Sequence, residues 1–290
     1  MSKLLSIPAS HSQNHGTWAQ AQFLLFWYSW LRWQRTDVSA LPPPIIIGAL
    51  GGSGTRMLVQ FLQSAGVWMG SWINPRTEDA MATRHFFQKY FADTFCLLEQ
   101  QQKIPAHLLA CFQQTIRAHR WHIPQPEQAW GFKNPRSMWL IPFIQQLYPD
   151  MKFIHVVRDG RDMALSNNQN LLAKHAGLLL GEAGMKQDML HQQLLLWDKG
   201  NRIARTTGEK LNKGHYLILK YEDLCFQPRE TLTTLLQFIG HPVDTTLIEQ
   251  GCQKLKPSPG IGRWQQQSTV IEAALTASIK ETLLDFAYDE

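Results

Sequence analysis

A glycine-rich turn directly after an apolar run is the feature that most constrains the fold of this chain. The run Ile45–Leu50 leads into Gly51-Gly52-Ser53-Gly54-Thr55-Arg56, and apolar residues then recur at helical spacing up to about Ala65. This pattern predicts a buried strand, a tight loop and a helix N-terminus. Glycines let the backbone approach a phosphate closely, and successive N–H groups then point at the anion. We therefore expect a phosphate or sulfate group to bind at residues 51–56.

Three later segments repeat the pattern of a strand that ends in polar residues. The segments 129–132, 152–157 and 216–220 are predicted strands, and they lead into Lys133, Arg158 and Tyr221. Predicted helices lie at 55–65, 137–147 (with Ser137 as its cap), 185–206 and 228–239. This alternation indicates an α/β fold with a doubly wound, mostly parallel sheet flanked by helices. Ligands of such sheets bind at the carboxyl ends of the strands, where these polar residues lie.

Two stretches stand outside this alternation. Residues 67–127 contain no convincing strand, but aromatic residues recur there at helical spacing, so we expect a helical insertion that packs in the core. Residues 1–41 form an aromatic-rich segment that we expect to be helical, and residues 42–290 form the main domain. The apolar run 23–31 is shorter than the about 20 residues that span a bilayer. It is interpreted as a helix packed on the domain, or as a membrane-surface or dimer contact.

Composition narrows the classes of partner. The formal net charge is +5 and the isoelectric point is near 9.0, which suits an anionic ligand. No run of five or more Lys or Arg residues occurs, so a nucleic-acid partner is not expected. The four cysteines form no C-x-x-C pair, and no metal site is indicated. No signal peptide is recognised, so we expect a cytoplasmic location.

The loop differs from that of a nucleotide-hydrolysing P-loop, G-x-x-x-x-G-K-[ST]. Ala49 stands where the first glycine belongs, and Thr55-Arg56 stands where Lys-Ser/Thr belongs. The lysine for the β- and γ-phosphates and the hydroxyl that binds magnesium are both missing. The loop still offers backbone N–H groups, the hydroxyls of Ser53 and Thr55, and the guanidinium of Arg56. This set suits a donor whose transferred group needs no bridging metal.

Four motifs in order resemble those of the sulfotransferases that use 3′-phosphoadenosine 5′-phosphosulfate (PAPS). They are the loop 51–56, the strand that ends in Arg158 with Ser166 eight residues on, the run Lys220-Tyr221-Glu222-Asp223-Leu224, and Gly262-Arg263-Trp264. The resemblance covers roughly residues 44–270. It implies that residues 51–56 bind the 5′-phosphosulfate, and that Tyr221 lies near the adenine. It also implies that Arg158, Ser166 and Arg263 hold the 3′-phosphate, through the charge-assisted bonds that arginine forms with phosphate.

The chain departs from the family pattern at one position of the loop. A lysine or arginine commonly precedes S-G-T in the family and bridges the leaving phosphate and the sulfuryl group, but here that position is Gly52. Arg56 is the nearest replacement for the missing charge. Lys133 is the second, because it ends a predicted strand and would point at the same crevice.

Sulfuryl transfer to a hydroxyl also needs a group that takes the proton. The run 74–79 of this chain follows the first predicted helix. In the carboxylate-using branches of the family the acidic base lies in the corresponding segment, which favours Asp79 and then Glu78. Both also suit the N-terminus of a helix, where carboxylates complement the macrodipole. His85 and His155 are rivals, although His155 lies in an apolar strand and is interpreted as a hydrogen-bonded core residue. His175 is a further residue expected near the acceptor.

The resemblance, taken with these residues, thus implies a PAPS-dependent sulfotransferase that modifies a hydroxyl, or an amine, of a small-molecule or glycan acceptor. Its product from the donor would be 3′,5′-adenosine bisphosphate (PAP). Two alternatives remain open at this point. One is a metal-dependent P-loop kinase of a small molecule, and the other is a non-catalytic nucleotide-binding protein on the same fold.

Overall fold

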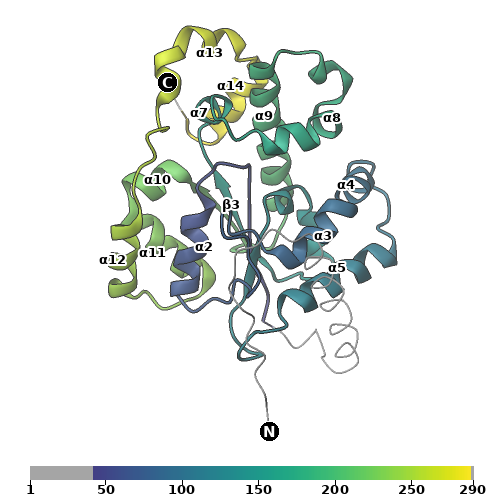
Figure 1. The fold of residues 1–290 in the computed structure, drawn as a ribbon, viewed down its shortest axis with the longest axis vertical. Coiled ribbons are helices and arrows are strands. Elements are labelled where there is room, and N and C mark those ends of the chain that lie inside the picture. Colours follow the sequence, from purple (N-terminus) through teal and green to yellow (C-terminus); the bar gives the residue numbers. More distant parts are fainter. Residues whose placement is uncertain (1–41, 289–290) are drawn as a thin grey trace, which may run out of the picture. The chain divides into compact units, whose positions relative to one another are not determined.

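A parallel sheet of four strands organises the part of the chain that the computed structural model describes, residues 42–288 (Figure 1). The strands lie in the order β2 (Gly131–Lys133), β1 (Ile45–Ala49), β3 (Lys152–Val157) and β4 (Tyr216–Lys220). Every neighbouring pair is parallel. The predicted strands are therefore confirmed, and their carboxyl ends meet at one edge of the sheet.

Helices cover both faces of the sheet because its strands are apolar on both sides. Ile45 and Ile47 contribute to one hydrophobic cluster, together with α2 (Thr55–Ser64), α11 (Pro228–Ile239) and α12 (Thr245–Lys254). Ile46 contributes to a second cluster on the opposite face. That face carries α3 (Met81–Lys89), α5 (Ala106–His119), α6 (Ile141–Gln145), α9 (Met189–Gly208) and α14 (Ala277–Asp285). The predicted α/β class is confirmed.

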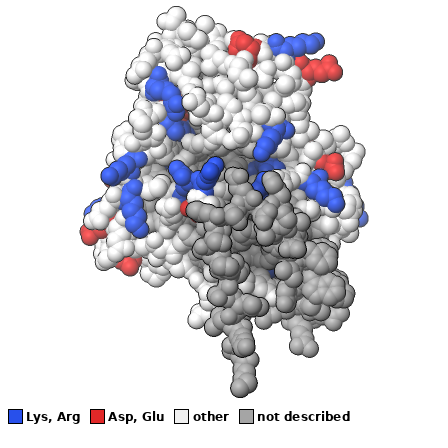
Figure 2. All heavy atoms as spheres, viewed as in Figure 1, with Lys and Arg blue, Asp and Glu red and all other residues white. Residues whose placement is uncertain are grey.

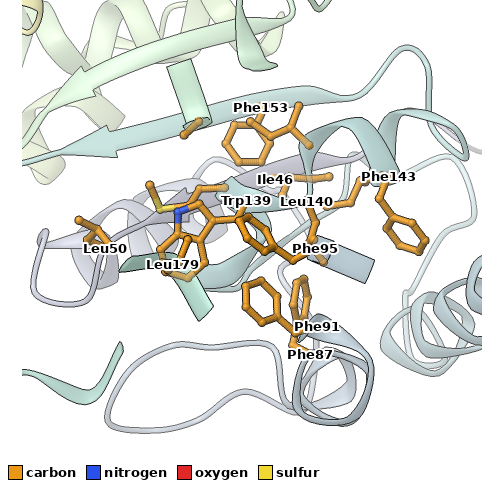
Figure 3. Close-up of a cluster of buried hydrophobic side chains, with 14 of the residues drawn as sticks. Ile46, Leu50, Phe87, Phe91, Phe95, Trp139, Leu140, Phe143, Phe153 and Leu179 are labelled. Atoms are coloured by element: carbon orange, nitrogen blue, oxygen red, sulfur yellow. The ribbon is translucent and has the colours of Figure 1, made fainter. Parts of the chain in front are cut away.

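Aromatic side chains dominate the second cluster. Phe91, from α4 (Phe91–Glu99), packs 5.8 Å from Phe95 and 5.6 Å from Trp139, measured between ring centroids (Figure 3). Phe86 stacks on Phe143 at 5.3 Å. These rings are almost completely buried. The aromatic stripe of residues 86–95 is thus part of the core, as its spacing indicated.

The prediction of one continuous helix over 137–147 is wrong, because the structure has two short helices there. A 3₁₀ helix, η2 (Pro135–Trp139), comes first, and α6 restarts the helical path two residues later. Asn134 caps η2, because its side chain accepts a hydrogen bond from the Arg136 N–H, whereas the Ser137 hydroxyl donates back to the Asn134 carbonyl. Pro142 has no N–H with which to continue a helix from η2. Ser137 is therefore not a cap.

A helix that the sequence did not predict, α8 (Asn170–Met185), precedes α9. Three glycines lower its helix propensity, and Gly181 interrupts it with a φ of 66°. The remaining elements are short or lie near the C-terminus. They are α7 (Gly160–Ala164), α10 (Tyr221–Phe226), η3 (Arg263–Gln267) and α13 (Ser268–Ala274).

Helices α3, α4 and α5 occupy the stretch 67–127, and the division of the chain at residues 41 and 42 stays a prediction. The aromatic segment 1–41, with its expected helix and its membrane or dimer contact, lies outside the described residues. Within residues 42–288, no helix combines the length and the apolar character needed to cross a membrane.

Candidate active site

A cleft of about 670 Å³ opens at the carboxyl ends of the strands. It is lined by the glycine-rich loop, by the segment before α3, by α3 itself, by the ends of β2, β3 and β4, and by α8. Nine of the predicted site residues line it: Gly51, Gly52, Gly54, Thr55, Arg56, Asp79, Lys133, Arg158 and Tyr221. Four do not: Ser53, Glu78, Ser166 and Arg263. The sheet therefore brings together residues that are far apart in the sequence.

The glycine-rich loop has the backbone that its sequence requires. Gly52 and Gly54 have φ values of 98° and 73°, a region that side chains disfavour. Gly54 is also the N-terminal cap of α2, and no side chain caps the first turn. The Met57 N–H donates to the Gly54 carbonyl at 3.3 Å, and the N–H groups that precede it at such a helix start can bind an anion. The Ser53 hydroxyl is buried and donates to the Leu50 carbonyl at 2.8 Å, so it stabilises the conformation of the loop.

Arg158 lies at the end of β3 with part of its guanidinium unpaired. Nη1 donates to the Gly52 carbonyl at 3.2 Å, and the guanidinium lies 4.8 Å from the centre of the Tyr221 ring. Nε and Nη2 are buried and have no hydrogen-bond partner among residues 42–288. Buried donors are nearly always satisfied in native proteins, and a charged donor is the costliest to leave unpaired. These two nitrogens are therefore available to donate to a bound anion.

Tyr221 packs directly on the loop. A Cβ atom at Gly54 would lie 2.2 Å from the Tyr221 ring, so only glycine fits there. The ring is thus held between the start of α2 and the guanidinium of Arg158. Burial raises the pKa of the Tyr221 hydroxyl above its usual value, which keeps it neutral.

Lys133 and Asp79 form an ion pair on the other side of the loop. Lys133 is only 5% exposed, and its Nζ lies 2.5 Å from Asp79 Oδ1. The same ammonium donates to the Thr77 carbonyl at 2.8 Å. Asp79 is 30% exposed and lines the cleft, and no partner among the described residues bonds its Oδ2. The pair places a carboxylate oxygen and a cation beside the loop. Arg56 lies nearby and donates to the Arg76 carbonyl at 3.2 Å.

The other predicted bases have different surroundings. Glu78 accepts a hydrogen bond from Gln60 at 3.2 Å. His155 is fully buried and bonds to the Tyr216 hydroxyl and the Asn201 side chain, as expected for a core histidine. His85 is exposed, and His175 packs on Phe91 at 4.6 Å; neither lines the cleft.

The segment that contains Arg263 is hydrogen-bonded to α7. Asp162 accepts hydrogen bonds from the N–H groups of Gly262 at 2.7 Å and Trp264 at 3.1 Å. Arg263 itself donates to the carbonyl of Leu165, which is the neighbour of Ser166, at 3.3 Å. Ser166 and Arg263 thus lie beside each other, although neither lines the cleft.

Several polar residues that line the cleft were not predicted. Arg84, Arg136 and Lys174 add positive charge, while Asn134, Asn168, Asn170 and Ser258 add neutral polar groups. Arg136 belongs to the run Lys133-Asn134-Pro135-Arg136 at a strand end, so its position carried a usable signal. Arg84 and Lys174 lie within helices α3 and α8 and carried none.

Comparison with known proteins agrees with this geometry. A family model described as "Sulfotransferase family" matches residues 43–245. The chain is 23% identical to protein-tyrosine sulfotransferase 2 of Gallus gallus over 224 residues, which covers 75% of this chain and 56% of that protein. Across this and three other curated relatives, the chain spans between 15% and 58% of their length.

Solved structures show the same fold at low sequence identity. Sulfotransferase STF9 from Mycobacterium avium matches 93% of this chain and 80% of its own, with a TM-score of 0.56 and 9% identity. The sulfotransferase domain of the Synechococcus PCC 7002 olefin synthase matches 88% of this chain and 98% of its own, with a TM-score of 0.53 and 18% identity. Since the family model alone covers more than half of the chain, the chain belongs to the sulfotransferase family.

Proposed function

We propose that this protein transfers a sulfuryl group from PAPS to a hydroxyl, or an amine, of a small-molecule or glycan acceptor. The observation that carries this proposal is that donors converge at the sheet edge: the start of α2 has no side-chain cap, and two buried nitrogens of Arg158 are unpaired. An anionic donor would satisfy both. The family to which the chain belongs supports the same assignment.

Each part of the donor has residues that fit it. Residues 51–56 would hold the 5′-phosphosulfate through backbone N–H groups and Thr55. Arg158 would hold the 3′-phosphate, with Ser166 and Arg263 beside it, and Tyr221 would face the adenine. When bound, the donor supplies an activated sulfuryl group; a magnesium ligand in the loop is not required for this.

Asp79 is the proposed base, because it lines the cleft and its Oδ2 is available to accept the acceptor's proton. Lys133, held by Asp79 and Thr77, would supply the positive charge that Gly52 cannot, with Arg56 as the second source. Glu78 is the weaker alternative, because its side chain bonds to Gln60 and does not line the cleft. A cytoplasmic location remains an expectation from the sequence alone.

A transfer assay tests the proposal. The full chain is incubated with PAPS labelled in the sulfate and with a metabolite and glycan extract of the native source. Label should move to a new compound while PAP is released, and heat-treated protein should give none. PAP binding without any labelled product would favour the non-catalytic alternative instead.

A further inference from the structure

The cleft continues beyond the residues assigned to the donor. The proposed donor residues lie at the ends of β1, β3 and β4, whereas β2 is the opposite edge strand of the sheet. The cleft is also lined by α3, η2 and α8, each of which contributes one cation: Arg84, Arg136 and Lys174. We call these three residues the basic rim. Lys133 ends β2, the strand beside β1, and pairs with Asp79 in the same cleft.

The basic rim has little compensating negative charge. Asp79 is the only acidic residue among the described residues that line the cleft, and it is already paired with Lys133. Within residues 42–288, no carboxylate lies within 4.0 Å of Arg84, Arg136 or Lys174. Lys and Arg side chains gather around the hollow in the surface, with few acidic ones near it (Figure 2).

The positive charges of the rim act on one another and on their neighbours. Burial lowers the pKa of Arg136, and the positive charge of Arg84 lowers it further. The carboxylate of Asp79 acts in the opposite direction and raises it. Burial also lowers the pKa of His175 to about 4, with further lowering from Arg136 and Lys174. Arg136 is fixed in place, because Nη1 donates to the Phe87 carbonyl and the guanidinium lies over the Phe87 ring. Like charges that line one cleft are relieved by an anion.

We propose that the basic rim is an acceptor subsite for an oxyanion, so that the acceptor is a small hydroxyl compound that itself carries a phosphate, sulfate or carboxylate group. This rests on the proposed function, because it takes the rest of the cleft to be the donor site. A cleft of about 670 Å³ must hold both partners, which favours an acceptor portion of sugar size. Asp79 would face its hydroxyl, and Arg84, Arg136 and Lys174 would bind its anionic group.

Binding to the PAP-saturated full chain tests this subsite. Glucose 6-phosphate and glucose form a probe pair that differs only in the anionic group. The phosphate should bind at least about tenfold more tightly, the worth of one charged hydrogen bond. The double variant Arg84→Gln/Lys174→Gln should remove this preference. Lys89→Gln, which removes an exposed charge from the same helix α3 outside the cleft, should keep it.

The affinity for PAP separates the two proposals. It should be the same in wild type and in both variants; if wild type does not bind PAP, the proposed function itself fails. If PAP binds but glucose 6-phosphate shows no preference over glucose, or if the double variant keeps the preference, the anionic subsite is overturned. Tighter binding of an acidic tyrosine peptide than of glucose 6-phosphate would overturn the small-molecule assignment.

Discussion

At the scale of single residues, Arg158 explains most about the site. It is 6% exposed, it contacts the glycine-rich loop and Tyr221, and it still leaves two donors unpaired. A buried, half-satisfied guanidinium is costly unless a ligand completes it. Arg158 therefore contacts the glycine-rich loop through one nitrogen and keeps two others that could bind a phosphate group of the proposed donor.

Replacing Arg158 should weaken the binding of PAP selectively. Arg158→Gln should cost about 1.5–3 kcal/mol of PAP affinity, because charged hydrogen bonds to a phosphate are lost. The affinity for 5′-AMP, which lacks the 3′-phosphate, should change much less. Calorimetric titration of both nucleotides measures this. Arg229→Gln, at an exposed surface position, is the control. Equal losses for both nucleotides would assign Arg158 to the 5′ side of the donor.

The neighbouring acids Asp79 and Glu78 make a matched pair of tests. Asp79→Asn should lower the transfer rate by about 10²–10⁴-fold, as expected for a lost general base, with PAP affinity largely kept. Glu78→Gln should stay active, because its side chain points to Gln60. Labelled-sulfate transfer and PAP titration are measured on both variants. An active Asp79→Asn protein combined with an inactive Glu78→Gln protein would reverse the assignment.

At the scale of elements, Asp162 ties the loop at residues 260–264 to α7. Its carboxylate accepts hydrogen bonds from two backbone N–H groups of a segment about a hundred residues away. The guanidinium carbon of Arg161 lies 3.8 Å from the centre of the Trp264 ring. These contacts hold Arg263 against the carbonyl next to Ser166. Asp162 is thus a positioning residue for the proposed 3′-phosphate site.

Asp162→Asn should loosen this loop, because an amide presents one acceptor where the carboxylate presents two. PAP should bind about tenfold more weakly, whereas 5′-AMP should bind as before. The further change Arg263→Gln should add little in the Asp162→Asn background, since both act on one contact. Full additivity of the two losses would show that Asp162 and Arg263 act independently.

Local patterns were enough to predict the strands and the glycine-rich loop. The buried strand β1 follows from its own unbroken apolar run. The positive φ angles at Gly52 and Gly54 follow from the glycines themselves. The contacts of Asp162 and the basic rim depend on residues far apart in the chain, and periodicity carries no such information. Helix α8 was missed for a different reason: tertiary packing of Leu172 and Leu179 outweighs the low propensity of its glycines.

At the scale of the whole molecule, histidines with lowered pKa values make stability depend on pH, and His119 and His155 are the most deeply buried of them. Burial lowers the pKa of His119 and of His155 to about 4, whereas the unfolded value is about 6.5. Between these values the unfolded chain binds protons that the folded chain does not. The free energy of unfolding should therefore fall as the pH falls through this window, by about 3 kcal/mol for each histidine at most.

Urea unfolding at several pH values between about 7 and 4.5 measures this slope. The variant His155→Gln removes one titrating group and can still bond to Asn201, so its slope should be smaller. A variant with the same slope as wild type would mean that His155 is protonated in the folded protein.

The central claim is that the cleft recognises a nucleotide by its 3′-phosphate, and the most direct measurement is a calorimetric comparison of nucleotides on the wild-type chain. PAP should bind at least about a hundredfold more tightly than 5′-AMP, with no need for magnesium, because the 3′-phosphate adds charge-assisted bonds. Equal affinities for PAP and 5′-AMP, or tighter binding of ADP with magnesium, would contradict the account.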